Sequence, residues 1–152
     1  MKELFGNIWE VAGPDDAIVI TTNGYVRKDG TAVMGRGIAL QATQRDPEVA
    51  KTLGNYLQNM GNHVYKIHDD PLWLSFPVKH HWKDQADTIL IERSSYELLQ
   101  WVDDYYPYFM HKIYMPRPGC GNGRLKWEDV KPLISKILED DRFIVVEYET
   151  TS

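Results

Sequence analysis

Cysteine is nearly absent from this sequence of 152 residues, which contains Cys120 and no other. A single cysteine excludes an internal disulfide framework and a Cys-x-x-Cys zinc or redox motif. Long apolar runs are lacking as well, so no segment predicts a transmembrane helix, which needs about 20 apolar residues. The first ten residues do not contain the apolar core of a secretory signal peptide. We therefore expect a cytoplasmic protein with no membrane partner.

Positive charge is also scarce, since 17 Lys and Arg face 22 Asp and Glu and the net charge is −5. This balance argues against an extended surface that follows a nucleic-acid backbone over many phosphates. It does not exclude a small anionic ligand, because backbone N–H groups at a helix N-terminus can hold one phosphate. Aromatic residues, in contrast, make up 12% of the chain. They indicate either a well-filled core or a site that stacks on flat rings, and composition leaves both open.

Predicted strands and helices alternate along the chain. The strands are expected at residues 2–5, 17–22, 63–67, 73–78, 113–115 and 143–148. The helices are expected at residues 38–45, from Pro47 to a stop at Gly61, from Thr88 to about Tyr106 with Pro107 as terminator, and from about Glu128 onward. The second strand is apolar and β-branched nearly throughout, which is typical of a strand buried on both faces. This order predicts one α/β domain over residues 1–152, with three layers, α/β/α, and a mixed, mostly parallel central sheet.

Two glycine-bearing loops follow predicted strands, at the sheet edge where ligands bind in folds of this class. The first begins at Asn23 and reaches a helix through the segment Gly35-Arg36-Gly37-Ile38. The second, residues 116–124, carries glycines at alternate positions, whose N–H groups could form a nest for an oxyanion. Each loop could also be a tight turn that binds nothing, and Asn23 a simple turn residue. Together they predict two anionic groups held close to each other, as in a diphosphate.

A third loop at the same edge begins with Lys79-His80-His81. Adjacent side chains of an extended segment point in opposite directions, and no cysteine or carboxylate cluster accompanies the histidines, so we expect no metal site. Lys79 could pair with a phosphate, act as a nucleophile if desolvation lowers its pKa, or simply be solvated. Cys120 has no visible His–Asp partners, so we interpret it as a small residue in a tight loop.

Four segments, in this order, resemble the macrodomain, an ADP-ribose-binding α/β/α module. They are Gly6-Asn7-Ile8 and the segments 18–24, 33–39 and 115–127. The Pro-x-x-Gly-Cys-Gly loop followed by Trp127 is similar to one subgroup. That subgroup contains the terminal ADP-ribose glycohydrolase of animals and the antitoxin macrodomains that remove ADP-ribose from thymidine in DNA. Residues 76–82 resemble the antitoxin segment that carries the catalytic lysine, and Lys79 is the matching position.

The resemblance implies an ADP-ribosyl hydrolase without a cofactor, in which Lys79 acts at the distal ribose and ADP-ribose leaves a modified macromolecule. The ligand-binding residues that it implies are Asn7, Ile8, Asn23, Gly35, Arg36, Gly37, Ile38, Pro116, Gly119, Cys120, Gly121, Asn122, Gly123 and Arg124. The expected partner is ADP-ribose, free or attached to a macromolecule, and the antitoxin subgroup adds a toxin outside this chain. The alternatives are a non-catalytic ADP-ribose-binding module, an ADP-ribose-1″-phosphate phosphatase, and an interaction protein that has lost the ligand.

The chain departs from the family pattern in three places. Asn7 stands where the family usually has an aspartate that accepts from the adenine amino group, so this hydrogen bond would lack a charged acceptor. Gly123 stands where the animal glycohydrolase has an aspartate in its Gly-Cys-Gly loop. Residues 25–32 are additional length, which could cap the site or select a substrate.

Overall fold

The structure is a computed structural model that describes residues 1–105 and 111–148. Within these residues, six strands form one sheet in the order β1-β6-β5-β2-β4-β3. Their bounds are β1 Lys2–Gly6, β2 Ala17–Asn23, β3 Lys66–His68, β4 Leu72–Lys79, β5 Ile113–Pro116 and β6 Phe143–Tyr148. The β3–β4 pair is antiparallel and the other pairs are parallel. The predicted mixed, mostly parallel sheet is therefore confirmed.

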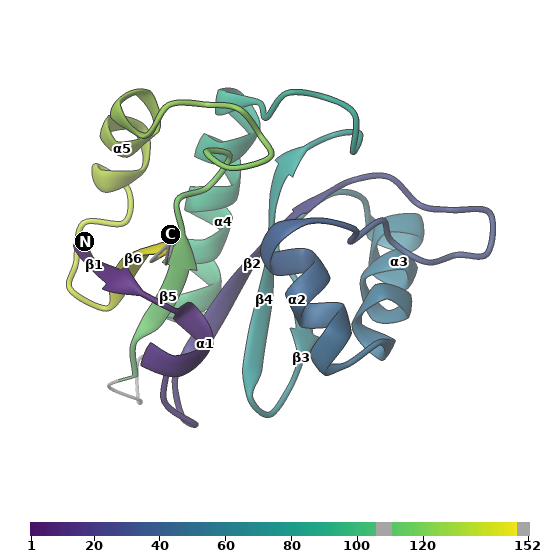
Figure 1. The fold of residues 1–152 in the computed structure, drawn as a ribbon, viewed down its shortest axis with the longest axis horizontal. Coiled ribbons are helices and arrows are strands. Elements are labelled where there is room, and N and C mark those ends of the chain that lie inside the picture. Colours follow the sequence, from purple (N-terminus) through teal and green to yellow (C-terminus); the bar gives the residue numbers. More distant parts are fainter. Residues whose placement is uncertain (106–110, 149–152) are drawn as a thin grey trace.

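Helices cover both faces of this sheet. Their bounds are α1 Ile8–Val11, α2 Gly37–Arg45, α3 Glu48–Met60, α4 Thr88–Tyr105 and α5 Trp127–Ser135. Side chains of β2 alternate between two apolar clusters, with Val19 packed among residues of α4 and α5 and Ile20 among residues of α1, α2 and α3. In Figure 1, α2 and α3 lie together on the right, next to β4, whereas α4 and α5 lie to their left. The predicted three-layer architecture is therefore confirmed.

Three local features differ from the sequence prediction or extend past what the structure describes. Helix α1 was not predicted, because a helix of four residues is too short to show a 3.6-residue period. Strand β3 begins at Lys66 and not at His63, because the Glu97 carboxylate holds the segment before it through the Val64 N–H at 2.9 Å. The expected end of the third predicted helix at Tyr106, before Pro107, lies outside the described residues.

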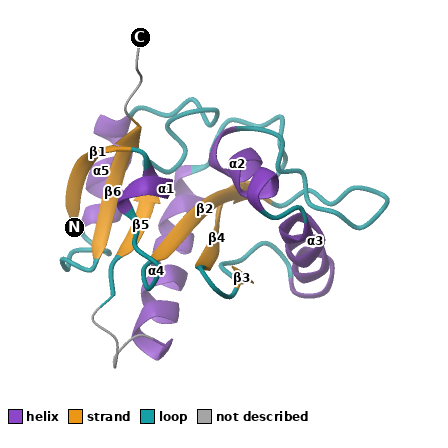
Figure 2. Cartoon of the chain, turned by 60° about the horizontal axis from the view of Figure 1, so that its bottom comes forward, coloured by secondary structure: helices purple, strands orange, loops and turns teal. Residues whose placement is uncertain are grey.

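The parallel strands direct their carboxyl ends to one edge of the sheet, which Figure 2 shows from a tilted view. The loops after β2, β4 and β5 therefore leave the sheet close together, as the fold prediction required. Strands β1 and β6 end at the same edge, where Gly6 pairs in register with Tyr148. None of the helices in the described ranges is long and apolar enough to cross a membrane.

Candidate functional site

A cleft of about 1030 Å³ opens at the carboxyl edge of the sheet. Ligand pockets in proteins usually occupy about 300–1,000 Å³, so the cleft has room for a ligand of nucleotide size. Its walls come from the ends of β1, β2, β4 and β6, from the start of α2, and from the loop after β5. The residues that form it are thus far apart in the sequence and are brought together by the strand order.

The predicted site residues converge on this cleft with two exceptions. Those in its lining are Ile8, Asn23, Gly35, Arg36, Gly37, Ile38, Lys79, Pro116, Gly119, Cys120, Gly121, Asn122 and Gly123. Asn7 is not in the lining and instead caps α1, since its Oδ1 accepts a hydrogen bond from the Trp9 N–H at 3.0 Å. Arg124 is not in the lining either, and its φ of 65° places its backbone in the left-handed region. Sequence position alone does not reveal either arrangement.

The loop after β5 combines a tight turn with an open surface. A Cβ atom on Gly123 would lie 2.4 Å from the Gly119 oxygen, so this position requires glycine. The turn is closed by the Leu125 N–H, which donates to the Gly119 oxygen at 2.9 Å. At Gly121, in contrast, a Cβ atom would meet nothing within 4 Å. Gly123 therefore shapes the turn, whereas Gly121 leaves the backbone open to a group in the cleft.

The start of α2 lies directly against this loop. Gly37 has a φ of 56°, and a Cβ atom there would lie 3.2 Å from the Asn122 Nδ2. The N-cap residue Arg36 provides no side-chain cap for the first turn. Uncapped N–H groups at a helix N-terminus are suited to an anionic oxygen. The two glycine-bearing loops of the sequence prediction are therefore neighbours in space.

Lys79 ends β4 and extends its amine across the cleft. Its Nζ donates to the Trp82 oxygen at 3.3 Å and to the Asn122 oxygen at 3.2 Å. Burial lowers the pKa of this amine below its ordinary value, and the positive charges of Arg124 and Arg36 act in the same direction, against Asp84. The uncharged amine is therefore more available than in a solvated lysine.

The backbone of Lys79 is held as well as its side chain. Its oxygen accepts from the Gly24 N–H and from the Asn62 Nδ2, each at 3.1 Å. On the neighbouring strand, Asn23 is paired with Lys79 in register. The Asn23 side chain donates to the Val33 oxygen at 2.9 Å and accepts from the Tyr25 N–H at 3.0 Å, so it is a turn residue and a lining residue at once.

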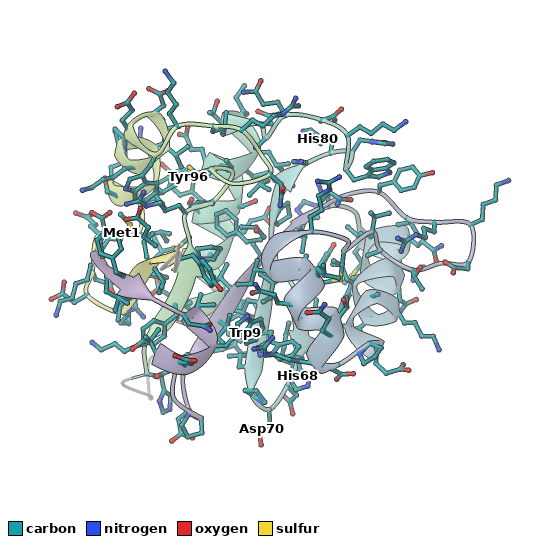
Figure 3. The ribbon with its side chains drawn as sticks, viewed as in Figure 1. Met1, Trp9, His68, Asp70, His80 and Tyr96 are labelled. Atoms are coloured by element: carbon teal, nitrogen blue, oxygen red, sulfur yellow. The ribbon has the colours of Figure 1, made fainter. Side chains whose placement is uncertain are left out.

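The other candidate groups of the sequence analysis have ordinary structural partners. Burial raises the pKa of the Cys120 thiol to about 11, which keeps it protonated and unreactive near neutral pH. His80, labelled in Figure 3 on the segment after β4, has its Nε2 at 3.1 Å from the Asp87 carboxylate. The His81 Nδ1 accepts from the Lys83 N–H at 3.1 Å. The two histidines therefore have separate contacts and no shared metal geometry.

Sequence reasoning did not single out several residues that line the cleft. At the Lys79 end these are Tyr25, Arg27 and Trp82. At the opposite end, Arg117 pairs with the Glu147 carboxylate at 2.8 Å. The Arg117–Glu147 contact joins residues 30 apart, so no local pattern signals it. The additional length at 25–32 was the available hint of Tyr25 and Arg27.

Comparison of the sequence with known proteins gave no match to a family model. The chain is 28% identical over 143 residues to a DNA ADP-ribosyl glycohydrolase of Thermus aquaticus, with 88% of this chain and 36% of that protein covered. It is 26% identical over 130 residues to a DNA ADP-ribosyl transferase–DNA ADP-ribosyl glycohydrolase fusion protein of Thermosipho africanus, with 70% and 32% covered. The chain thus spans about a third of the length of these curated relatives.

Solved structures give a fuller match. The macrodomain of Thermus aquaticus DarG superimposes with a TM-score of 0.76 at 26% identity, covering 98% of this chain and 97% of that one. Thermosipho africanus DarTG, solved in complex with ADP-ribose, gives a TM-score of 0.67 at 23% identity, covering 89% and 38%. The chain therefore has the macrodomain fold and is similar to the macrodomains of DarG proteins.

Proposed function

We propose that this chain binds ADP-ribose in the cleft and hydrolyses the bond between its distal ribose and a modified macromolecule. The observation that carries the proposal is the position of the Lys79 amine, which is partly desolvated and donates to the Asn122 oxygen, in the loop that lies against the start of α2. The names of the curated relatives and the ADP-ribose complex of a structural neighbour support the same activity. We propose further that residues 1–152 act as one macrodomain.

The diphosphate of the ligand would lie between the start of α2 and the loop after β5. The N–H groups of the first turn of α2 and the open backbone at Gly121 provide donors, and Arg36 adds positive charge. Adenine would then lie toward the ends of β1 and β6. The Asn7 oxygen accepts from the Trp9 N–H and does not line the cleft, so this placement assigns no adenine contact to Asn7.

This placement brings the anomeric carbon of the distal ribose to Lys79. In the reaction, the bond from that carbon to the leaving group breaks, the oxygen of a water molecule becomes bonded to the carbon, and a water proton passes to the leaving group. The uncharged Lys79 amine could bond to the carbon as the leaving group departs, and water would then displace the amine from that carbon; alternatively, the protonated amine could stabilise the departing group. In both cases, fixing the diphosphate orients the reacting carbon and lowers the barrier.

The macromolecule that we propose is DNA, because the curated relatives are named as DNA ADP-ribosyl glycohydrolases. The transferase in the name of the Thermosipho africanus fusion protein supports a second proposal. A DNA ADP-ribosyl transferase would act as the toxin, and this chain would remove the group that it adds.

A non-catalytic ADP-ribose-binding module is the second candidate. Among the described residues, the lining carries one carboxylate, Glu147, and this group is paired with Arg117. No lining carboxylate therefore lies ready to activate water beside Lys79. In the proposed hydrolase, catalysis would depend on the Lys79 amine, so its loss would stop release of ADP-ribose. In a non-catalytic module, the wild type would release none either.

The test combines calorimetry with release assays on wild type and Lys79→Ala. ADP-ribose is titrated first; release is then measured from an ADP-ribosylated oligonucleotide, an ADP-ribosylated peptide ester and ADP-ribose-1″-phosphate. We expect both proteins to bind ADP-ribose and only the wild type to release it, with the oligonucleotide as the best substrate. Full release by Lys79→Ala would contradict the role of the lysine. Binding without release by the wild type would favour the non-catalytic module.

A further inference from the structure

Three aromatic side chains lie in contact at the Lys79 end of the cleft. The rings of Tyr25 and His81 meet edge to face, with centroids 4.7 Å apart. The His81 ring stacks on Trp82 with centroids 5.5 Å apart and planes 28° from parallel. Tyr25 and Trp82 also line the cleft. We call these three residues the aromatic wall.

Two rings of the aromatic wall, Tyr25 and Trp82, are exposed to solvent. All five tryptophans lie in the described residues, and Trp82 is the most exposed of them, at 44%. Tyr25 is exposed to 40%. Large rings that remain open to solvent inside a cleft are surfaces on which a ligand can be buried. Contacts between the rings account for how they are held, and parts of Tyr25 and Trp82 remain open to solvent.

The main chain holds both sides of the wall in place. On the Tyr25 side, residues 26 and 32 form a bridge, and this short hairpin packs on α3 so tightly that a Cβ atom on Gly54 would lie 1.9 Å from the Gly30 oxygen. On the other side, the Asp84 N–H donates to the His81 oxygen at 3.1 Å. The wall is therefore preformed, which reduces the entropy lost when a ligand binds.

The wall also lies where a substrate would extend past ADP-ribose. The Trp82 oxygen accepts from the Lys79 Nζ, so the wall begins directly beside the proposed reaction centre. The loop after β5, which we propose to hold the diphosphate, contacts the same Nζ through the Asn122 oxygen. A group attached to the distal ribose would thus leave the cleft past Trp82.

The charges around the wall suit a nucleic acid. Arg27 lines the cleft with its guanidinium fixed by a hydrogen bond to the Ala32 oxygen at 2.9 Å. The Lys83 Nζ lies 5.1 Å from the centroid of the Trp82 ring. Aromatic faces next to cations are the combination that stacks bases and neutralises phosphates in single-stranded nucleic acids. An aliphatic acyl side chain of a protein offers no ring to stack.

We propose that the aromatic wall contacts the group from which ADP-ribose is released and selects a nucleobase of a nucleic-acid strand over an acyl side chain. This inference rests on the proposed function, because it requires ADP-ribose in the cleft with its distal ribose at Lys79. It makes Trp82 and Tyr25 specificity-determining residues, and it gives the additional segment 25–32 a role in substrate selection.

The test compares wild type with Trp82→Ala, Trp82→Phe and a control, Tyr96→Ala. Tyr96 is a tyrosine of α4 that is 56% exposed and does not line the cleft, and Figure 3 labels it. For each protein, kcat/KM is measured on an oligonucleotide with ADP-ribose on a base and on a peptide with ADP-ribose on a glutamate ester. We expect Trp82→Ala to lower kcat/KM for the oligonucleotide about tenfold, the size of one lost stacking contact, with less than about twofold change for the peptide. Trp82→Phe keeps a ring and retains most of the activity, and Tyr96→Ala matches the wild type.

Other results would contradict the inference in distinguishable ways. Equal losses on both substrates, or no loss on either, would overturn the role of the wall and leave the proposed function intact. If the wild type binds ADP-ribose but releases it from neither substrate, affinity for the modified oligonucleotide decides: weaker binding by Trp82→Ala supports the wall, and equal binding refutes it. A wild type that does not bind ADP-ribose would overturn both proposals.

Discussion

Two clefts lie at opposite ends of the same sheet and differ in charge. The cleft at the carboxyl edge is lined by Arg27, Arg36, Lys79 and Arg117, with Glu147 as its one carboxylate among the described residues. A second cleft of about 730 Å³ lies near the amino ends of β2 and β4 and is lined by Asp15, Asp16, Asp69 and Asp70. Figure 3 labels His80 and Asp70 at opposite ends of the molecule.

This comparison explains how an acidic chain can hold an anionic ligand. The net charge of −5 describes the whole molecule, whereas a ligand meets the charges of one cleft. Exposed charges separated by more than about 10 Å are largely screened at physiological salt, so the aspartates of the second cleft have little effect at the first. Net charge alone is therefore a poor guide to the ligands of a small α/β domain.

The largest expected effect is a loss of ADP-ribose release when the lysine of the first cleft is replaced, compared with replacement of the lysine of the second cleft. Lys79→Ala removes the amine at the proposed reaction centre, so we expect release of ADP-ribose to fall about 100-fold or more. Lys66 lines the second cleft and pairs with Asp69 at 2.8 Å, and Lys66→Ala should change release by less than about twofold. Initial rates of release from an ADP-ribosylated oligonucleotide measure both. Equal losses in the two variants would show that the carboxyl-edge cleft has no special role.

The next effect distinguishes two glycines of the loop after β5. A Cβ atom on Gly123 would overlap the Gly119 oxygen at 2.4 Å, so Gly123→Ala should destabilise the fold by about 1–3 kcal/mol. The Cβ atom added by Gly121→Ala meets no neighbour within 4 Å, so the free energy of unfolding should stay within about 0.5 kcal/mol of the wild-type value. Urea denaturation measures the first difference. ADP-ribose titration of Gly121→Ala then tests whether its open backbone contacts the ligand, in which case affinity falls although stability does not.

A smaller effect is expected at Asn62, which contacts the backbone of Lys79 and does not line the cleft. Its Nδ2 donates to the Lys79 oxygen at 3.1 Å, so Asn62→Ala loosens the end of β4 without removing a group from the cleft. We expect kcat to fall a few-fold, about the cost of one hydrogen bond of roughly 0.5–1.5 kcal/mol, with KM little changed. A rise in KM with kcat unchanged would mean that Asn62 affects binding of the substrate and not the position of the amine.

The smallest expected effect is a shift along the pH axis. The pKa of Lys79 is lowered by burial and by the charge of Arg124, so Arg124→Gln should raise this pKa toward its ordinary value. If the uncharged amine reacts, the rate increases as pH rises through the pKa, and the rising limb of Arg124→Gln moves to higher pH. Profiles of kcat against pH for the two proteins measure this shift. A limb that falls with pH would assign the reaction to the protonated amine.

Much of the fold could be predicted from local patterns. The run at 17–22 is apolar because both faces of β2 are buried, and the helices of more than one turn have recognisable periods or terminators. Helix α1 and the late start of β3 escaped prediction, because one is a single turn and the other depends on a contact with Glu97 from a distant helix. Local sequence therefore predicted the layers better than the ends of the elements.

The candidate site was predictable where its residues follow strands directly. Asn23, Lys79 and Pro116 end neighbouring strands, so a correct sheet edge was enough to bring them together. The contact between Tyr25 and His81 was not predictable, because it depends on β2 and β4 being adjacent in the sheet. Asn7 shows the limit of a motif, since the matching position caps a helix in place of lining the cleft. The binding roles of all these residues stay predictions.

The pairing of β1 with β6 has a consequence for the order of events during synthesis. The ribosome makes β1 first and β6 last among the described strands, yet β1 finds its partner in the sheet only in β6. Gly6 and Tyr148, which line one end of the cleft, are therefore far apart until the final strand has emerged. In the nascent chain, the Lys79 end of the cleft would form before the other end. The cleft could therefore bind the whole of the proposed ligand only near the end of folding.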